Sequence, residues 1–460
     1  MPNRTGPTPL ARAAARAHAQ IVDEYVRRHP RSAALAAHAR ESLPGGDTRT
    51  VTHYEPFPVF ITRGEGCRIA DVDGHTYLDL LGNYTAMIWG HAHPEIVAAA
   101  SAQIAQGTGF AAPTPAQLTL AEMLCARLPS VERIRFANSG TEAAMHAIRA
   151  ARAFTGRDKI VKMEGGYHGS YDAVAISVQS DPVRAGPASR PVAVPEGPGI
   201  PAGVAGDVLV VPFNDPAAVE ATLRAQAGEI AALIVEPVQG VAGTIPPQEG
   251  FLPFLRAITA ELGIVLIFDE VISFRLDYHG AQGLFGVRPD LTVLGKIIGG
   301  GFPVGAFGGR REIMDLYDPR RPGALAQSGT FNANPVTVAA GIAGLRLLTP
   351  EAIARCNRTG ETLRAGLQAL FDEARLPARV TGIGSLLTVL FTDAEVVNVR
   401  AARTADRVLT AAFHLGLLLE GVFCAPRGMM ATSLPMGPDE VNEALTAARR
   451  VVDRIMAAVR

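Results

Sequence analysis

The sequence predicts an α/β protein built around a mostly parallel sheet that is buried on both faces. Five short apolar runs have the length and composition of buried strands, and they lie at 132–137, 159–163, 230–235, 264–268 and 291–294. Helical segments separate several of these runs, at 141–155 and 251–262, and this alternation is typical of parallel strands covered by helices. The chain has 460 residues, of which 48% are hydrophobic, so it can bury a large core in two or three domains.

Residues 1–90 are expected to form an N-terminal helix and a small antiparallel segment. The Ala- and Arg-rich start of the chain predicts an amphipathic helix that ends near His29-Pro30, because proline cannot continue a helix. Three strand-like runs follow, at 57–61, 67–72 and 76–81. Asp73-Gly74, between the last two runs, is a typical hairpin turn.

Residues 91–345 are expected to form the large α/β domain that carries the parallel sheet. From Pro94 the apolar residues recur at helical spacing until Gly107, which is a residue that ends helices. Further helices are expected at 115–128, 141–155, 251–262 and 334–348. The stretch 182–206 is rich in Pro, Gly and Ala, and it predicts a long surface loop or flap.

Residues 346–460 are expected to form a smaller α+β domain, because the pattern changes beyond Pro350. A helix follows this proline, and strands are expected within 378–391. Two more amphipathic helices are expected at 402–416 and 438–458.

Charge and cysteine content exclude several classes of protein. The 43 Lys and Arg residues balance 44 Asp and Glu, so no excess positive charge drives nucleic-acid binding. With 19% charged residues the chain is too apolar to be disordered. The four cysteines lie far apart, which argues against a zinc site or a disulfide framework and favours a reducing cytoplasm. No stretch approaches about 18–20 uninterrupted apolar residues, so we expect no membrane-spanning segment.

Four of the predicted strands are followed by residues that can carry chemistry. These segments are 138–142 (NSGTE), 165–169 (GGYHG), 268–271 (FDEV) and 294–301 (LGKIIGGG). In open α/β sheets, ligands bind at the carboxyl ends of the strands. Ser139, Gly140 and Thr141 precede a predicted helix, and free N–H groups at a helix N-terminus suit an anion. Ser139 with Glu142 is equally consistent with an ordinary capping box.

The other three segments offer an acid, an amine and an aromatic ring. Asp269 emerges from a buried strand and suits a cationic partner or a metal, or else caps a helix. Lys296 is flanked by apolar residues, and a desolvated lysine titrates more readily to the amine that attacks carbonyls; a lone lysine beside a strand is otherwise structural. Tyr167, between glycines, can stack on a planar ligand or belong to a plain turn. Together the four segments match pyridoxal 5′-phosphate (PLP), which needs a lysine Schiff base and often an aspartate at its ring nitrogen.

From about Gly45 to the C-terminus the sequence resembles the class-III (ω-type) PLP-dependent aminotransferases. The matching segments are 63–80, 90–96, 136–152, 165–169, 236–240, 268–271, 289–309 and 328–335. The resemblance implies a fold-type I PLP-dependent transferase, with a large cofactor domain and a small α+β domain built from the N- and C-terminal segments. It also implies a soluble, cytoplasmic enzyme with no nucleic-acid or membrane partner.

The resemblance implies the following roles around the cofactor. Lys296 would be the Schiff-base lysine and the general acid/base, and Asp269 would keep the pyridine nitrogen protonated. Tyr167 and Val271 would pack on the two faces of the ring. The other cofactor-binding residues that it implies are Ser139, Gly140 and Thr141 in the phosphate cup, His168, Glu236 and Gln239 near the ring, and Thr330. Thr330 would reach the phosphate from the neighbouring subunit, which implies a homodimer with shared active sites.

Two subfamilies compete within this class. Glutamate-1-semialdehyde 2,1-aminomutases have very similar LGKIIGGG and DVDG segments, and Phe302-Pro303-Val304 is closer to them. The β-amino-acid (β-phenylalanine type) transaminases are favoured by residues 48–58, by Tyr84-Thr85 and by Arg427.

A transaminase must bind two acids in turn, and arginine binds carboxylates bidentately. The expected substrate-binding residues are Arg49, Val51, Tyr84 and Arg427. Arg49 would hold the carboxylate of the β-amino acid, and Arg427 that of a 2-oxo acid such as 2-oxoglutarate or pyruvate. The prediction is therefore a β-amino-acid transaminase, with the aminomutase as the alternative.

Overall fold

The computed structural model describes residues 9–179 and 181–458, and its centre is a seven-stranded sheet. In spatial order the strands are β4 (Arg133–Ala137), β10 (Gly305–Gly309), β9 (Leu291–Gly295), β8 (Val265–Asp269), β7 (Ile230–Val235), β5 (Lys159–Met163) and β6 (Val208–Val211). Strands β9, β8, β7, β5 and β6 run parallel, and β10 is antiparallel to both of its neighbours. The five predicted strands are confirmed, whereas β6 and β10 were not predicted.

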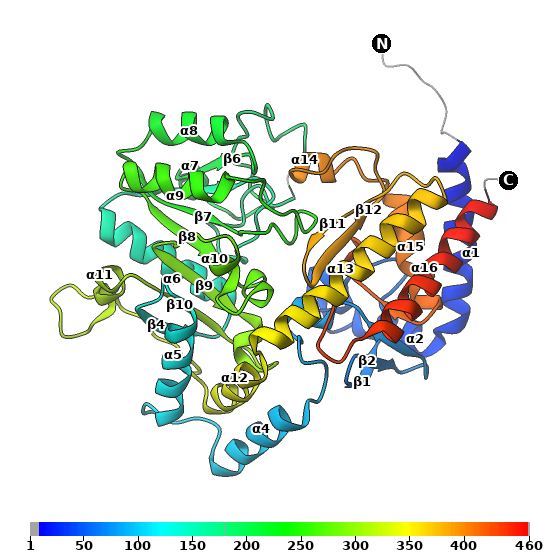
Figure 1. Ribbon diagram of the computed structural model, residues 1–460, viewed down its shortest axis with the longest axis horizontal. Helices are drawn as coiled ribbons and strands as arrows, with labels where there is room; N and C mark the ends of the chain where they lie inside the picture. The colour runs from blue at the N-terminus through cyan, green and yellow to red at the C-terminus, as the bar shows by residue number, and fades with distance from the viewer. Residues whose placement is uncertain (1–8, 180, 459–460) are drawn as a thin grey trace.

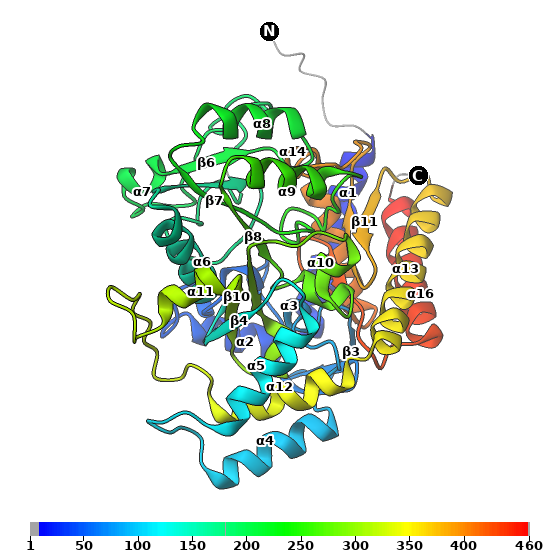
Figure 2. The same ribbon diagram turned by 60° about the vertical axis from the view of Figure 1, so that its left-hand side comes forward.

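Helices cover both faces of this sheet, as the apolar runs predicted. Those of the large domain are α4 (Pro94–Gln106), α5 (Pro115–Arg127), α6 (Gly140–Thr155), α7 (Ala202–Gly206), α8 (Pro216–Ala225), α9 (Phe251–Glu261), α10 (Gly280–Leu284), α11 (Arg311–Met314) and α12 (Pro335–Leu347). Within β7, Ala232 and Ile234 pack in the core on the α6 face, whereas Leu233 and Val235 pack in the core on the α9 face. Figure 2 shows α8 and α9 on one side of the strands and α6 on the other.

The N-terminal part holds two helices and a small sheet. Helix α1 (Pro9–Arg28) ends where predicted, and α2 (Pro30–Ala39) follows it. The sheet contains β1 (Ile61–Glu65), β2 (Arg68–Asp71), β3 (Thr76–Asp79) and β13 (Val422–Phe423). The strand predicted at 57–61 is wrong, because the ladder begins only at Ile61 and continues to Glu65. Pro56 and Pro58 lack the N–H donors that a ladder needs, and Phe57 and Val59 are buried in the core without strand pairing.

The C-terminal part packs against the N-terminal part and shares its sheet. It contains α13 (Pro350–Glu373), β11 (Arg379–Ile383), β12 (Leu386–Leu390), α14 (Val399–Ala402), α15 (Arg407–Leu419), β14 (Met429–Ala431) and α16 (Pro438–Ala457). β13 pairs in parallel with β3, and one core joins residues of α1, α13, α15 and α16. Figure 1 shows these helices together, on the opposite side of the molecule from α8 and α9. The helix predicted at 402–416 instead begins after Asp406, whose carboxylate accepts hydrogen bonds from the N–H groups of Val408 and Leu409.

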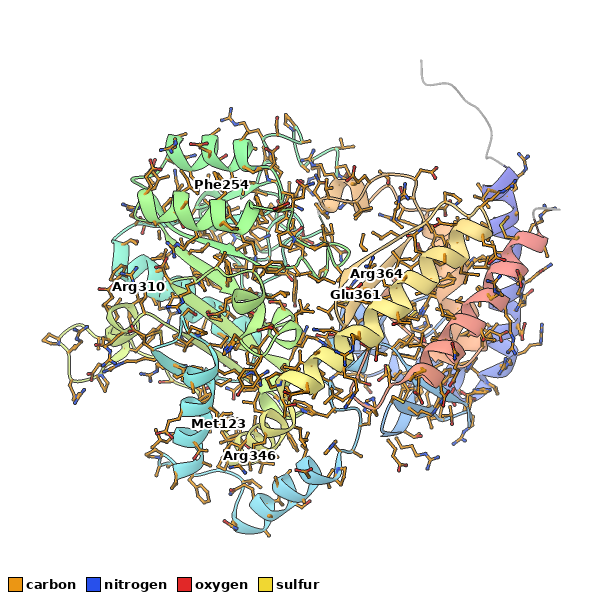
Figure 3. All side chains as sticks on the ribbon, in the orientation of Figure 1. Met123, Phe254, Arg310, Arg346, Glu361 and Arg364 are labelled. Carbon is orange, nitrogen blue, oxygen red and sulfur yellow. The ribbon has the colours of Figure 1, made fainter. Side chains whose placement is uncertain are left out.

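Helix α13 is also tied to the turn between β11 and β12. Glu361 forms an ion pair with Arg364 at 2.6 Å, and both side chains project from α13 in Figure 3. The other carboxylate oxygen of Glu361 accepts a hydrogen bond from Gly384 N at 2.6 Å. Ser385, in this turn, accepts a hydrogen bond from Arg275, which follows β8, at 3.0 Å.

Two further segments depart from regular structure. The stretch predicted as a loop has no helix or strand from 182 to 201, and α7 begins at Ala202. Residues Gly82–Thr85 form a turn, α3, in which all four residues have positive φ angles between 49° and 77°. Short 3₁₀ turns occur at Pro44–Gly46, Thr50–Thr52, Ser273–Leu276, Lys296–Gly299 and Asp315–Tyr317. Within the described ranges no single helix is long and apolar enough to cross a membrane, but α12 and α13, bent by 78°, pass that test as a pair.

Candidate active site

Lys296 lies directly after β9 and lines a cavity of about 1000 Å³ at the carboxyl end of the sheet. Its φ angle of 51° is uncommon for a residue with a side chain, and such backbone is typical of functional sites. Burial lowers the pKa of its amine to about 8, and the nearby carboxylates of Glu236 and Asp269 oppose this shift. The amine is therefore easier to deprotonate than that of an ordinary lysine.

Asp269 ends β8, the strand next to β9, and its carboxylate is held at two points. One oxygen lies 2.8 Å from His168 Nδ1, and the other accepts a hydrogen bond from Val271 N at 3.1 Å. Burial lowers the pKa of His168, although the Asp269 carboxylate partly opposes this shift. The pair fixes an acid at the end of a buried strand, as the FDEV segment predicted.

The segment after β4 caps the start of α6. Ser139 Oγ accepts a hydrogen bond from Glu142 N at 3.2 Å, and Glu142 accepts one from Asn138 N at 2.8 Å. Ser139 is thus an N-cap, whereas Glu142 bonds to Asn138 N instead of Ser139 N, so the predicted capping box forms only in part. The cavity nevertheless reaches Ser139. Thr141 Oγ1 accepts a hydrogen bond from Ser170 N at 3.2 Å, so the α6 start and the GGYHG turn meet.

Glycines allow these two segments and Val271 to come together. A Cβ atom at Gly169 would lie 2.3 Å from Thr141 Oγ1, so a side chain cannot fit there. A Cβ atom at Gly140 would lie 3.1 Å from Val271 Cγ2. Tyr167, in the same turn, is 42% exposed and lines the cavity.

Glu236 and Gln239 lie after β7, and both are buried. The Glu236 carboxylate accepts hydrogen bonds from Tyr167 N at 2.9 Å and Gly240 N at 3.2 Å. Burial and the Asp269 charge raise the pKa of Glu236 to about 8. Gln239 Nε2 donates to Glu164 O at 3.0 Å, and its Oε1 has no hydrogen-bond partner among the described residues.

The four residues predicted to bind substrate line the same cavity as Lys296. Arg49 donates a hydrogen bond to Asn83 Oδ1 at 2.8 Å, and the Tyr84 hydroxyl donates to Val51 O. The Arg427 guanidinium lies 5.3 Å from the centre of the Tyr84 ring, and burial lowers its pKa. The chain thus brings one arginine from each end of the sequence to one wall.

The family model for class-III aminotransferases matches residues 50–447. The chain belongs to this family. A glutamate-1-semialdehyde 2,1-aminomutase of Methanothermobacter thermautotrophicus is 46% identical, with 86% of this chain and 92% of that protein covered. An ω-transaminase from Sphaerobacter thermophilus has a similar structure, with a TM-score of 0.90, 44% identity and coverage of 94% of this chain and 99% of that one. A β-phenylalanine aminotransferase from Variovorax paradoxus has a TM-score of 0.87, 39% identity and coverage of 96% and 97%.

As a class-III aminotransferase the protein is PLP-dependent, and the donor set fits this cofactor. Lys296 supplies an amine of lowered pKa, and Asp269 supplies a carboxylate on the adjacent strand. Gly169 and Gly140 let the GGYHG turn and Val271 pack closely against the start of a long helix, whose first N–H groups suit a phosphate. Gln239 Oε1 is a buried polar atom without a partner among the described residues.

The lining of this cavity does not include every predicted site residue. The predicted residues absent from it are Gly140, Thr141, His168, Glu236, Gln239, Asp269, Val271 and Thr330. Thr330 is also exposed. Asn83 and Asn138, the loop residues Glu196 and Ile200, and Phe302 line the cavity but were not predicted as site residues. The position of the 182–206 loop depends on tertiary contacts, so its composition alone did not point to the cavity.

Lys162 is a further residue that sequence reasoning missed. Its side chain is completely buried, and its Nζ donates to Gly166 O at 2.9 Å and Ile176 O at 2.5 Å. Burial lowers the pKa of this amine to about 8. A lysine in the middle of the apolar run KIVKM was the available signal, because lysine is rarely buried without partners. Lys162 therefore holds the GGYHG turn through the carbonyl oxygen of Gly166.

Proposed function

We propose that this class-III aminotransferase moves the amino group of a β-amino acid, an aryl- or alkyl-substituted 3-aminopropanoate, to a 2-oxo acid such as 2-oxoglutarate or pyruvate. One observation carries the proposal: Arg49 and Arg427 line one cavity with Lys296, where Arg49 donates a hydrogen bond to Asn83 and Arg427 lies over the ring of Tyr84. Both substrates carry a carboxylate, and each carboxylate needs a cationic side chain other than the reacting amine to bind it.

The residues of the chain divide the chemistry between them. PLP, when bound, supplies an electron sink for the negative charge at the substrate carbon. Lys296 is the group that takes a proton from that carbon and returns it, and a pKa of about 8 suits this task near neutral pH. Asp269, held by His168, would supply a negative charge to the ring nitrogen of the cofactor.

The remaining roles follow from the positions around the cavity. We assign the phosphate to Ser139, Gly140 and Thr141 at the start of α6, where the N–H groups of a 16-residue helix favour an anion. Tyr167 and Val271 would contact the two faces of the ring. The proposed partners of its phenolic oxygen are Gln239 and Glu236.

We also propose that the protein is a homodimer with shared active sites. Thr330 is exposed and adjoins Phe331, which is 64% exposed. In a dimer, Thr330 would contact the phosphate held by a second copy of the chain. Mixing two inactive variants, Lys296→Ala and Thr330→Ala, tests this, because a shared site requires that mixed dimers regain one intact site. Mixtures without any recovered activity would contradict the shared site.

The aminomutase is a second candidate because a 46% identical relative has that name. Such an enzyme receives one substrate and needs one carboxylate site, so a second arginine in the cavity has no evident task in it. The two candidates therefore differ in whether Arg427 binds an acid.

A paired assay tests the proposal. The PLP-loaded enzyme is incubated with 3-amino-3-phenylpropanoate and either 2-oxoglutarate or pyruvate, and in parallel with glutamate-1-semialdehyde alone. We expect glutamate or alanine to form in the first mixtures. The matched control is 2-amino-3-phenylpropanoate, which has the same groups with the amine on the other carbon and should react much more slowly. Isomerisation of the semialdehyde without any amino transfer would overturn the proposal in favour of the aminomutase.

A further inference from the structure

Arg275 is a buried arginine whose hydrogen-bond partners are all uncharged. It lies in the 3₁₀ turn Ser273–Leu276, a few residues after Asp269, and is 2% exposed. Among the described residues, its guanidinium donates to three oxygen atoms and lies near one thiol, and none of these partners is a carboxylate. A buried charge without a counter-ion is unfavourable, so the position needs a compensating role.

The partners of Arg275 come from segments that are far apart in the sequence, two of which adjoin residues that line the active-site cavity. Nη1 donates to Thr85 O at 3.1 Å, and Nη2 donates to Thr432 O. Nε donates to Ser385 Oγ at 3.0 Å, in the turn between β11 and β12. One side chain thus joins the end of the Gly82–Thr85 turn to the residue that follows β14.

The Gly82–Thr85 turn has a conformation that its sequence does not favour. Its φ angles are 54°, 49°, 53° and 77°, and three of the four residues have side chains. Left-handed backbone is unfavourable for such residues and persists only where the surroundings impose it. Asp79 holds the start of the turn by accepting hydrogen bonds from Leu81 N and Gly82 N, both at 2.9 Å. Arg275 holds its end through Thr85 O.

Both candidate substrate arginines rest on the residues of this turn. Arg49 donates to Asn83 Oδ1 at 2.8 Å, and Arg427 lies over the Tyr84 ring. Arg427 also precedes β14, whose far end Arg275 contacts at Thr432. The separation between the two arginines therefore depends on where the turn and β14 are fixed.

We propose that Arg275 is a positioning residue for substrate recognition: it holds the left-handed turn and β14 together and so fixes Arg49 and Arg427 relative to Lys296. This inference rests on the proposed function, because it takes the two arginines as the carboxylate-binding groups. Its consequence is that Arg275 sets the carboxylate-to-amine spacing that the enzyme accepts, without touching substrate or cofactor.

Kinetics of Arg275→Met and Arg275→Lys test the proposal in the PLP-loaded enzyme. We expect Arg275→Met to raise the KM for both 3-amino-3-phenylpropanoate and 2-oxoglutarate by about tenfold, the loss expected when a charged hydrogen bond is misaligned. Because Lys296 and Asp269 are untouched, kcat and the visible absorbance of the cofactor should change little. Arg275→Lys keeps the charge and can still reach one carbonyl, so it should show a smaller rise in both KM values.

Arg127→Met is the matched control. Arg127 is also buried, and its guanidinium lies 4.8 Å from the ring centre of Phe274, the neighbour of Arg275, but it donates to Tyr278 O rather than to the turn. Its replacement should lower thermal stability and leave both KM values unchanged. Equal KM effects from the two positions would show that Arg275 is merely structural and would overturn the proposal, as would unchanged KM values in both Arg275 variants.

A second substitution tests whether the effect runs through the turn. Glycine adopts positive φ angles without penalty, so adding Thr85→Gly to Arg275→Lys should move both KM values back toward those of the wild type. KM values in the double variant that equal those of Arg275→Lys would overturn the proposal. Failure of the proposed function can be distinguished from failure of the Arg275 proposal. If the proposed function is wrong, the wild-type enzyme itself will not transfer the amino group of the 3-amino acid.

Discussion

The two sides of the active-site cavity are built differently. The cofactor side consists of the ends of neighbouring strands in one sheet, and it contains Lys296 after β9, Asp269 at the end of β8 and Glu236 after β7. The substrate side consists of Arg49, Tyr84 and Arg427, which come from distant parts of the chain. In the proposed function, the chemical step common to all substrates is thus placed on the strand ends of the sheet, and selection among substrates on segments that can vary without disturbing it.

Burial and bonding follow the same division. The Asp269 carboxylate is 5% exposed and is held by two hydrogen bonds. Arg49 is exposed and donates a hydrogen bond to Asn83. Arg427 lies over the Tyr84 ring, and its buried Nε has no hydrogen-bond partner among the described residues. Changes on the cofactor side should therefore affect every substrate, whereas replacement of Arg49 or Arg427 alone should affect the two acids unequally.

The largest effect is expected from Lys296→Ala. In the proposed function, removing the amine would remove both the covalent link to the cofactor and the group that moves the proton, so turnover should fall by about 10³-fold or more for every donor and acceptor. The measurement is kcat with two donors and two acceptors, together with the visible absorbance of the cofactor-loaded protein. Full activity in this variant would show that another group carries the chemistry.

A smaller loss is expected from Asp269→Asn, which keeps the shape and removes the charge. Turnover should fall by about 10²-fold, because the negative charge against the ring nitrogen is lost while the contact with His168 can persist. KM values for the two substrates should change little. A substrate-dependent loss would contradict the division between the two sides of the cavity.

Arg427→Ala should act on one substrate more than on the other. Loss of a charged hydrogen bond should raise the KM for 2-oxoglutarate by about tenfold to a hundredfold, with a much smaller rise for the 3-amino acid. Arg49→Ala is the matched variant and should show the opposite preference. If both variants shifted both KM values equally, the assignment of one arginine to each acid would be wrong.

The cofactor side could be predicted from the sequence because each of its motifs is local. Ser139, Asp269 and Lys296 each lie within two residues of the end of a strand-like run, so a strand and its chemistry are encoded within a few residues. β10 was missed because GAFGG has no strand-like composition. Its first glycine is required by a neighbour, since a Cβ atom at Gly305 would lie 1.9 Å from Ser139 O.

The substrate side could be predicted only in part, because tertiary contacts determine it. Arg49 and Arg427 were predicted through a family resemblance, and no local pattern placed them on one wall. The left-handed turn that carries Asn83 and Tyr84 has no glycine after Gly82, so its conformation is imposed from outside by residues such as Arg275. The erroneous strand at 57–61 has a similar origin, because its apolar residues enter a core formed with distant helices.

The smallest expected effect concerns the stability of the part of the molecule in which α15 packs with α1 and α16. His414, in α15, is buried beside Tyr54, and burial lowers its pKa from 6.5 to about 3. The folded protein keeps this ring neutral, while the unfolded chain binds a proton below about pH 6.5. The free energy of unfolding is therefore highest above pH 6.5 and falls by about 1.4 kcal/mol per pH unit as the pH drops from there toward 3.

His414→Phe should remove that contribution, because phenylalanine keeps a ring beside Tyr54 and cannot bind a proton. Urea unfolding at pH 7.5 and pH 5.5 should show a loss of stability that is about 1 kcal/mol smaller in the variant than in the wild type. The same substitution at His38, whose side chain is 79% exposed, is the control and should leave the pH dependence unchanged. Equal pH dependence in His414→Phe and the wild type would place the acid sensitivity elsewhere. Urea unfolding could also show two transitions, of which His414→Phe shifts only one. That result would show that the part built from α1, α15 and α16 unfolds separately from the sheet that holds the cofactor.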